Sequence, residues 1–142
     1  MSLPTALSTL CETLRTGLGV PVALGLPETA EPALHVWPWR LEELAEAAHP
    51  PVHTLPHRPG TRLATPAQAV HLLLMVQPAN TAEGLRWLAE ARMVLLAHPV
   101  LQVEGATAQV LLSPLPVEQL TSLFLAARLP LRLCLSAVLR GG

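Results

Sequence analysis

The chain has 142 residues, a length that suits one domain with a well-buried core and leaves little for a second. Its charged residues are nine Arg and ten Glu, and the net charge of −1 with no basic cluster argues against nucleic-acid binding. Hydrophobic residues make up 51% of the chain and mean hydropathy is +0.43, high for a monomer, so we expect other subunits to cover part of the apolar surface.

The sequence does not predict a membrane protein. Every stretch of about 18 residues contains proline or a charged side chain, whereas a membrane-spanning helix needs an apolar run of that length. The N-terminal segment is interrupted by Glu12 and Arg15 and lacks the leading basic region of a signal peptide, so we expect the protein to be made in the cytoplasm. Cys11 and Cys134 are far apart and lie on apolar faces, which predicts buried, unpaired thiols.

The first third of the chain predicts a helix, two strands and a second helix. Apolar residues recur every three or four positions over residues 4–16, which predicts an amphipathic helix. Alternating apolar residues over 20–26 predict a strand, and Pro21 favours a sheet edge or the very start of that strand. Aromatic and β-branched residues over 34–39 predict a second strand, and residues 41–46 predict a short exposed helix.

The middle of the chain predicts a long loop, a strand and a helix. Residues 49–66 hold five prolines and one glycine, which predicts a loop. The apolar run over 67–77 fits a buried strand or a buried helix, and we favour the strand. Asn80 and Glu83 have the spacing of a capping box at the start of a helix. The apolar face of this helix is formed by Leu85, Leu88, Leu95 and Leu96. Trp87 lies off that face and is expected to be partly exposed.

The last third of the chain predicts two or three further elements. Residues 103–112 predict one strand, or two short strands folded at Gly105. Pro116 suits the start of a helix whose apolar side is formed by Leu120, Leu123, Phe124 and Ala127. Alternating leucines over 129–135 predict a final strand. The order α-β-β-α-β-α-β-α-β predicts an α+β fold, a single domain with a mixed β-sheet flanked by helices.

The sequence contains no convincing catalytic or metal-binding constellation. His49, His53 and His57 have a spacing that would align them on a helix and could bind zinc, but the prolines among them favour a solvated loop. There is no Gly-x-Ser-x-Gly elbow, no Asp and no Gly-rich phosphate loop, and the glutamates over 42–46 are typical of a solvated face. We therefore predict no enzyme, metal or cofactor, with a small-molecule or metal-binding module on the His49–His57 loop as the alternative.

Two tryptophans suggest where a partner could bind. Trp37 and Trp39 point the same way if their segment is a strand. Core packing is the favoured role for this pair. The other possibility is an interface anchor, because Trp and Arg dominate binding hot spots and Arg40 stands directly beside them.

Several segments at turn and core positions form a set. They are the leucine-rich first helix, the strand ending near Pro27, Ala33-Leu34-His35-Val36-Trp37, Arg58-Pro59, Val70-His71-Leu72-Leu73-Leu74, His98-Pro99-Val100-Leu101, Leu112-Ser113-Pro114-Leu115-Pro116-Val117-Glu118-Gln119-Leu120 and Pro130-Leu131-Arg132-Leu133. Over most of the chain this set resembles the terminal cap, or tail-terminator, proteins of phage-tail-like contractile injection systems. That family usually shows Asn and Arg after the second strand and Tyr in the apolar strand, where this chain has Arg40-Leu41-Glu42-Glu43 and His71.

The resemblance implies a tail-terminator-like fold and a structural role. The implied assembly is a ring, expected to be a hexamer, that closes the inner tube and sheath of a phage-tail-like particle. Its implied partners are further copies of the chain, the tube protein and the sheath protein. Such a ring is built from heterologous interfaces that close by rotation, which would cover the surplus apolar surface. The expected interface residues are Trp39, Arg40, Glu42, Glu43, Arg58 and Arg62. An adaptor domain of an unrelated complex is a further alternative.

Overall fold

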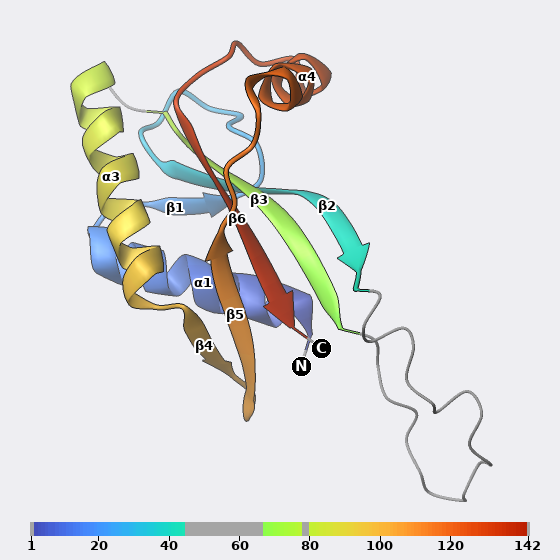
Figure 1. Ribbon diagram of the computed structural model, residues 1–142. Helices are drawn as coiled ribbons and strands as arrows, with labels where there is room; N and C mark the ends of the chain where they lie inside the picture. Colours follow the sequence, from blue (N-terminus) through green and yellow to red (C-terminus); the bar gives the residue numbers. More distant parts are fainter. Residues whose placement is uncertain (1, 45–66, 78–79, 142) are drawn as a thin grey trace, which may run out of the picture.

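The computed structural model describes residues 2–44, 67–77 and 80–141. These residues form a six-stranded sheet and three helices, which are α1 (Leu3–Leu18), α3 (Thr81–Ala97) and α4 (Val117–Ala127) (Figure 1). The strands, in spatial order, are β1 (Val22–Leu24), β2 (Leu34–Glu43), β3 (Gln68–Val76), β6 (Cys134–Gly141), β5 (Ala106–Leu112) and β4 (Val100–Val103). β1 runs parallel to β2 and the other neighbours are antiparallel, which confirms the predicted mixed sheet and α+β class.

The helices cover the two faces of the sheet unequally. α1 and α3 pack side by side on one face, where Leu10 and Leu14 of α1 join Leu72 and Leu74 of β3 in the main core. α4 lies across one end of the opposite face, where Phe124 packs with a second, smaller cluster on β3 (Figure 1). None of the described helices is long and apolar enough to cross a membrane.

The first helix forms as its apolar spacing predicts. The hydroxyl of Ser2 accepts a hydrogen bond from the Thr5 N–H and so caps the N-terminus, just before Pro4 in the first turn. Gly19 ends the helix in the left-handed conformation, with φ 68°, and its N–H donates to the Arg15 carbonyl at 2.9 Å. The predicted strand over 20–26 is shorter in the structure, where β1 is an edge strand as Pro21 indicated.

The predicted helix over 41–46 is wrong for its described part, residues 41–44. β2 continues through Leu41, Glu42 and Glu43, which pair with residues at the start of β3. Glutamates favour a helix only weakly, by a fraction of a kcal/mol each, whereas β3 offers a complete ladder of backbone partners and an apolar neighbour. Tertiary pairing therefore overrides the local preference.

The apolar run over 67–77 forms β3, as favoured from the sequence. This strand lies between β2 and β6 and has helices over both faces at one end. A strand covered on both faces needs no polar alternation, which explains why Leu72, Leu73, Leu74 and Met75 are consecutive and fully buried.

The capping prediction for α3 is confirmed, and its predicted apolar face is right for Leu88 and Leu95, which are buried, and wrong for Leu85 and Leu96. The Asn80 side chain accepts from the Glu83 N–H at 2.8 Å. Leu85 and Leu96 are 57% and 50% exposed, whereas Trp87, expected to be partly exposed, is only 5% exposed. The buried stripe is Gly84, Trp87, Leu88, Ala91 and Leu95. Trp87, Leu88, Ala91 and Leu95 are part of the main core between this helix and the sheet.

Residues 100–112 form two strands, which is the second of the two predicted alternatives, whereas the last strand begins later than predicted. β4 and β5 form a hairpin whose two turn residues, Glu104 and Gly105, have φ of 50° and 77°, the left-handed backbone of a tight hairpin turn. β6 begins only at Cys134, so the strand predicted over 129–135 is displaced. Arg128 ends α4 with φ 57°, and the Leu129 N–H donates to the Phe124 carbonyl. Residue 129 is thus still part of the helix end, and β6 begins later in the sequence than predicted.

Candidate functional site

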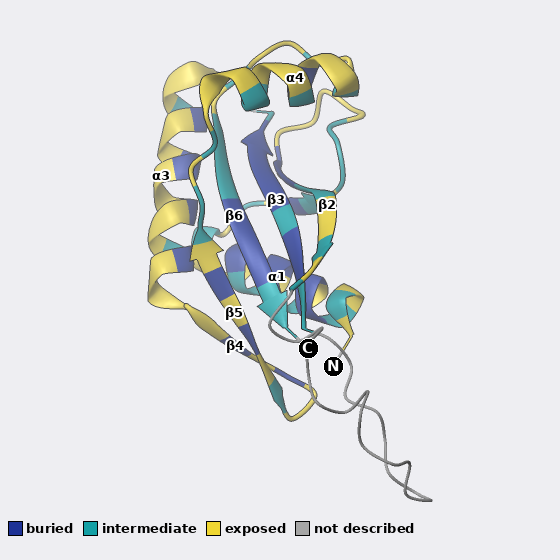
Figure 2. Ribbon diagram, turned by 45° about the vertical axis from the view of Figure 1, so that its right-hand side comes forward, coloured by how far each residue is buried: buried dark blue, intermediate teal, exposed yellow. Residues whose placement is uncertain are grey.

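One part of the sheet is not covered by any helix in the described chain. α4 covers the end of the face that contains Leu73 and Met75, and Figure 2 shows β3, β6 and β5 without a helix in front of them below it. Cross-strand partners share a face, so the register of the pairs defines the side chains on this uncovered part. The open sheet face consists of Arg40, Glu42, Ala69, His71, Val138, Arg140, Leu111, Gln109, Thr107, Val100 and Gln102.

A β-bulge shapes one side of the open sheet face. The register of β2 shifts between Pro38 and Arg40, so Trp39 has no partner residue on β3. Pro38 has no N–H and fits a position where the ladder is already interrupted. The Trp39 ring packs against the imidazole of His71, with centroids 5.5 Å apart and planes tilted by 54°.

Three charged or titratable side chains meet beside the bulge. Nη2 of Arg40 lies 2.7 Å from Oε2 of Glu42, and Nε2 of His71 lies 3.6 Å from Oε1 of the same carboxylate. The second distance is too long for a hydrogen bond, so the His71 contact is ionic only when the imidazole is protonated. Arg40 is about half exposed, and such a pair adds at most about 1 kcal/mol to stability. The cluster therefore orients side chains at the surface more than it holds the fold together.

Trp39 also carries an unusual polar atom. Its indole Nε1 is buried and has no acceptor among the described residues. Buried indole N–H groups usually find a partner, and an unmade hydrogen bond costs about 1–3 kcal/mol. The strand therefore holds Trp39 in a position that the described chain alone does not fully satisfy.

The predicted interface residues fall into three groups. Trp39, Arg40 and Glu42 lie together at the open sheet face. Glu43 pairs with Gln68 and is exposed on the opposite face, toward α1. Arg58 and Arg62 lie outside the described residues, as do the 49–66 loop and the His49–His57 alternative.

Sequence reasoning missed the partners that β3, β5 and β6 bring to the open sheet face. His71 is the one polar side chain inside the apolar run of β3, and that interruption is the signal that could have identified it. Leu111 is 47% exposed although it lies in a strand, because its side chain points to the uncovered face. Finding Leu111 from the sequence would have required the strand register.

The described residues offer little for chemistry. They contain no group of three or more His, Cys or Glu side chains that could hold a metal ion. Burial raises the pKa of the Cys11 and Cys134 thiols, and both cysteines are unpaired, so neither is poised as a nucleophile. Two open hollows of about 350 and 520 Å³ flank α3 without a carboxylate or an imidazole in their described lining, and a third of about 330 Å³ beside α1 is lined by Glu12 and His98.

Sequence comparison finds no match, whereas fold comparison finds solved structures with the same fold. No family model and no curated protein sequence match the chain. The fold matches the sheath/tube terminator, in its extended state, of PVC, an extracellular contractile injection system, with a TM-score of 0.73 and 13% identity over 99% of this chain and 56% of that one. It also matches the tube-terminating cap of the anti-feeding prophage, AFP, with a TM-score of 0.70 and 14% identity over 99% and 54%. The chain thus spans about half the length of these structures, and it has the fold of the terminator caps of contractile injection systems.

Proposed function

We propose that this chain is a structural cap that oligomerises into a ring, a hexamer, and ends the inner tube and sheath of a contractile phage-tail-like particle. The observation that carries the proposal is the fold match, which extends over 99% of the chain to a sheath/tube terminator and to a tube-terminating cap.

In this proposal the β2 side of the open sheet face meets a neighbouring copy in the ring. Arg40 and Glu42 present both charge signs there, and Trp39 lies beside them. A patch with an aromatic core and a mixed polar rim is typical of specific protein interfaces. Arg58 and Arg62 are proposed as further contacts on sequence grounds.

The test is co-expression of the chain with the tube and sheath proteins of the same particle. We expect the three to co-purify and electron micrographs to show capped tube ends, with a ring mass by mass photometry. The tube must be present, because a cap that assembles only on its tube would be a monomer in isolation. Tubes that grow to uncontrolled length with no bound chain would contradict the proposal.

A further inference from the structure

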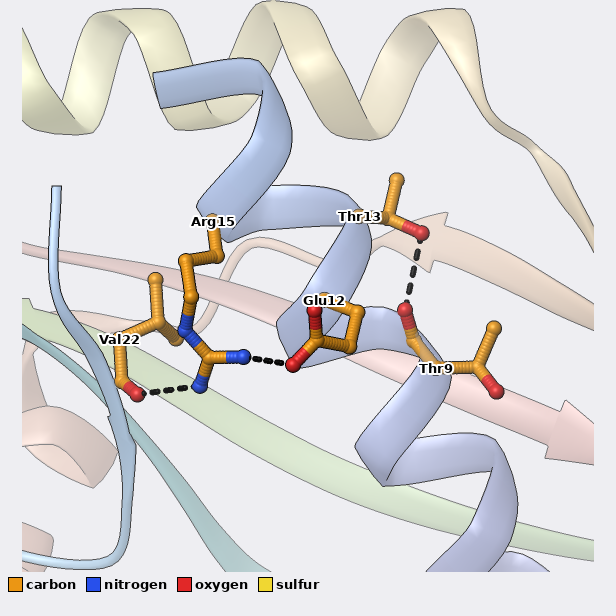
Figure 3. Close-up of polar contacts among 5 residues, drawn as sticks. All are labelled: Thr9, Glu12, Thr13, Arg15 and Val22. Atoms are coloured by element: carbon orange, nitrogen blue, oxygen red, sulfur yellow. Dashed lines mark hydrogen bonds and ion pairs between the residues drawn. The ribbon is translucent and has the colours of Figure 1, made fainter. Parts of the chain in front are cut away.

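The edges of the sheet do not favour joining one copy to the next by strand pairing. Nη2 of Arg15 donates to the Val22 carbonyl at 2.8 Å, and the same guanidinium contacts Glu12 on α1 (Figure 3). The Pro21 carbonyl accepts from the Leu34 N–H, so the Val22 carbonyl is the one that points away from β2, toward an added strand. At the other edge β4 has only four residues, and a short edge strand is itself protected. Neighbours in the proposed ring therefore meet through side chains.

A ring requires two different patches on every copy, because a heterologous contact joins one surface to another. The first patch lies at the end of β2. Leu41 and Glu43 share the face of this strand that is opposite to Arg40 and Glu42. Leu41 is 62% exposed, Glu43 is exposed, and no cation of the described residues pairs with Glu43. An apolar side chain and an exposed carboxylate thus lie together at this strand end.

The second patch is a hollow of about 350 Å³ between the first turn of α3 and the segment that leads into β6. Most of its wall is apolar, and the residues that form this wall include Val76, Gly84, Pro130 and Leu133. Leu133 is 47% exposed. The hollow is therefore open to an apolar side chain of a neighbouring molecule.

Arg132 places one positive charge in this hollow. Its Nη1 donates to the side-chain oxygen of Gln77 at 2.9 Å, and no carboxylate of the described residues pairs with it. A guanidinium has five N–H donors and binds a carboxylate in a planar fork. Thr81, in the first turn of α3, also lines the hollow, and the N-terminal end of a helix favours an anion. The hollow thus suits an apolar side chain that is accompanied by a carboxylate.

We propose that Leu41 and Glu43 of one copy dock in this hollow on the next copy. Glu43 pairs with Arg132, and Leu41 packs against Leu133. The proposal rests on the proposed cap function and names the second surface that its ring needs. The contact brings together two opposite charges that have no ionic partner within the described chain, and it covers two exposed leucines.

The positions of the two patches fit a head-to-tail contact. Glu43 pairs with Gln68 at the start of β3, whereas Val76 at its end lines the hollow, so about 26 Å of strand separates them. Both patches are on the side of the sheet that α1 and α3 cover, since Val76 and Val70, the partner of Leu41, belong to the main core. Figures 1 and 2 show the start of α3 and the end of β2 at opposite sides of the molecule. Patches placed in this way meet between copies and can repeat around a ring.

The experiment reverses the two charges in co-expression with the tube and sheath proteins, and mass photometry measures the rings. We expect Arg132→Glu alone and Glu43→Arg alone each to reduce the rings at least about tenfold, because like charges then meet at every contact. The double variant has opposite charges at every contact again and should recover the rings. Arg92→Glu, which lies outside both patches, is the control and should assemble like the wild type.

The outcomes separate this contact from the cap function. Rings that survive either single reversal would overturn the contact, as would a folded double variant that forms none, while wild-type rings on tube ends leave the cap function standing. A wild-type chain that forms no ring on the tube would contradict the cap function and, with it, this contact.

A second measurement covers reversals that disturb the fold. Glu43→Cys and Arg132→Cys are combined in one chain in a Cys134→Ala background, and the assembled particles are oxidised. The two thiols are too far apart to join within one copy, so we expect a ladder of linked copies on a non-reducing gel. Neither new cysteine alone should link copies, because a heterologous contact does not bring a residue to its own counterpart. Absence of the ladder, or equal linking by one cysteine alone, would refute the proposed contact.

Discussion

Gly17 on α1 faces Val94 on α3 so closely that a Cβ added to the glycine would lie 2.6 Å from Cγ2 of the valine. That distance is well below van der Waals contact, and a β-branched side chain has little freedom to move aside. The absence of a side chain at Gly17 is thus what lets the two helices on the same face of the sheet lie against each other.

Gly17→Ala should therefore destabilise the protein. Alanine gains up to about 1 kcal/mol of helix propensity, but the overpacking against Val94 costs about 1–3 kcal/mol. We expect a net loss of about 1 kcal/mol in the free energy of unfolding by urea denaturation. In a Val94→Ala background the same change should become stabilising by about 0.5 kcal/mol, since only the propensity gain remains. The same sign in both backgrounds would show that Val94 does not impose the constraint.

Arg15→Met should open the β1 edge. The hydrogen bond to the Val22 carbonyl is partly exposed, so we expect a stability loss of no more than about 1 kcal/mol. The larger effect should be concentration-dependent self-association, measured by light scattering, because the freed edge can pair with another chain. Arg86→Met is the matched control, since among the described residues the charged partner of Arg86 is Glu83 on its own helix. Equal scattering by the two variants would show that Arg15 does not protect the edge.

His35 should make the fold sensitive to acid. Both ring nitrogens are buried without a partner in the described structure, and burial, helped by the nearby Arg132 charge, lowers the pKa of His35 from its ordinary value of 6.5. The unfolded chain takes up the proton first, so stability is complete above about pH 6.5 and falls as the pH drops below it. The slope should approach about 1.4 kcal/mol per pH unit.

His35→Leu should flatten that acid-side slope and leave stability at pH 8 unchanged or higher, since an apolar side chain needs no partner there. The measurement is urea denaturation at pH 5, 6, 7 and 8. His98→Gln removes an exposed histidine and should retain the slope. A slope that survives in His35→Leu would assign the acid sensitivity to other groups.

Arg40→Glu should weaken assembly without unfolding the chain. In the wild-type chain Glu42 is paired with the cationic Arg40 at the β2 end of the open sheet face. The change replaces this cation and so places two carboxylates side by side. We expect at least a tenfold loss of ring or tube-bound particles by mass photometry, and a stability change below about 1 kcal/mol. Arg62→Glu is expected, on sequence grounds, to act in the same direction. Arg92→Glu on α3 is the control and should assemble normally.

Much of the fold could be predicted because the chemistry that sets it is local. The Asn80 cap, the Gly105 turn and the first helix each depend on a few neighbouring residues. The apolar run of β3 fitted a buried strand or a buried helix, and the strand that we favoured is the one that forms. The resemblance to tail terminators also gave the fold correctly, through turn and core segments spread over the chain.

The remaining features depend on contacts between distant parts of the chain. Two stripes on α3 have the same spacing, and only packing against the sheet selects the one with Gly84 and Trp87 over the one with Leu85. Trp39, Arg40 and Glu42 were expected at a surface, but their companion His71 enters through strand register, which sequence periodicity cannot supply.

Trp39 has no partner on β3, and this bulge shifts by one residue the alternation of β2 side chains between the two faces of the sheet. If Trp39 instead took a partner on β3, strict alternation from Leu34 would turn Arg40 and Glu42 toward α1 and bring Leu41 to the other side, beside Ala69. Deletion of Trp39 would not have this effect, because Pro38 and Arg40 already pair with consecutive residues of β3. The charged pair thus owes its place on the open sheet face to the bulge, and a one-residue deletion at the bulge would be tolerated where the same deletion farther along β2 would reverse the faces.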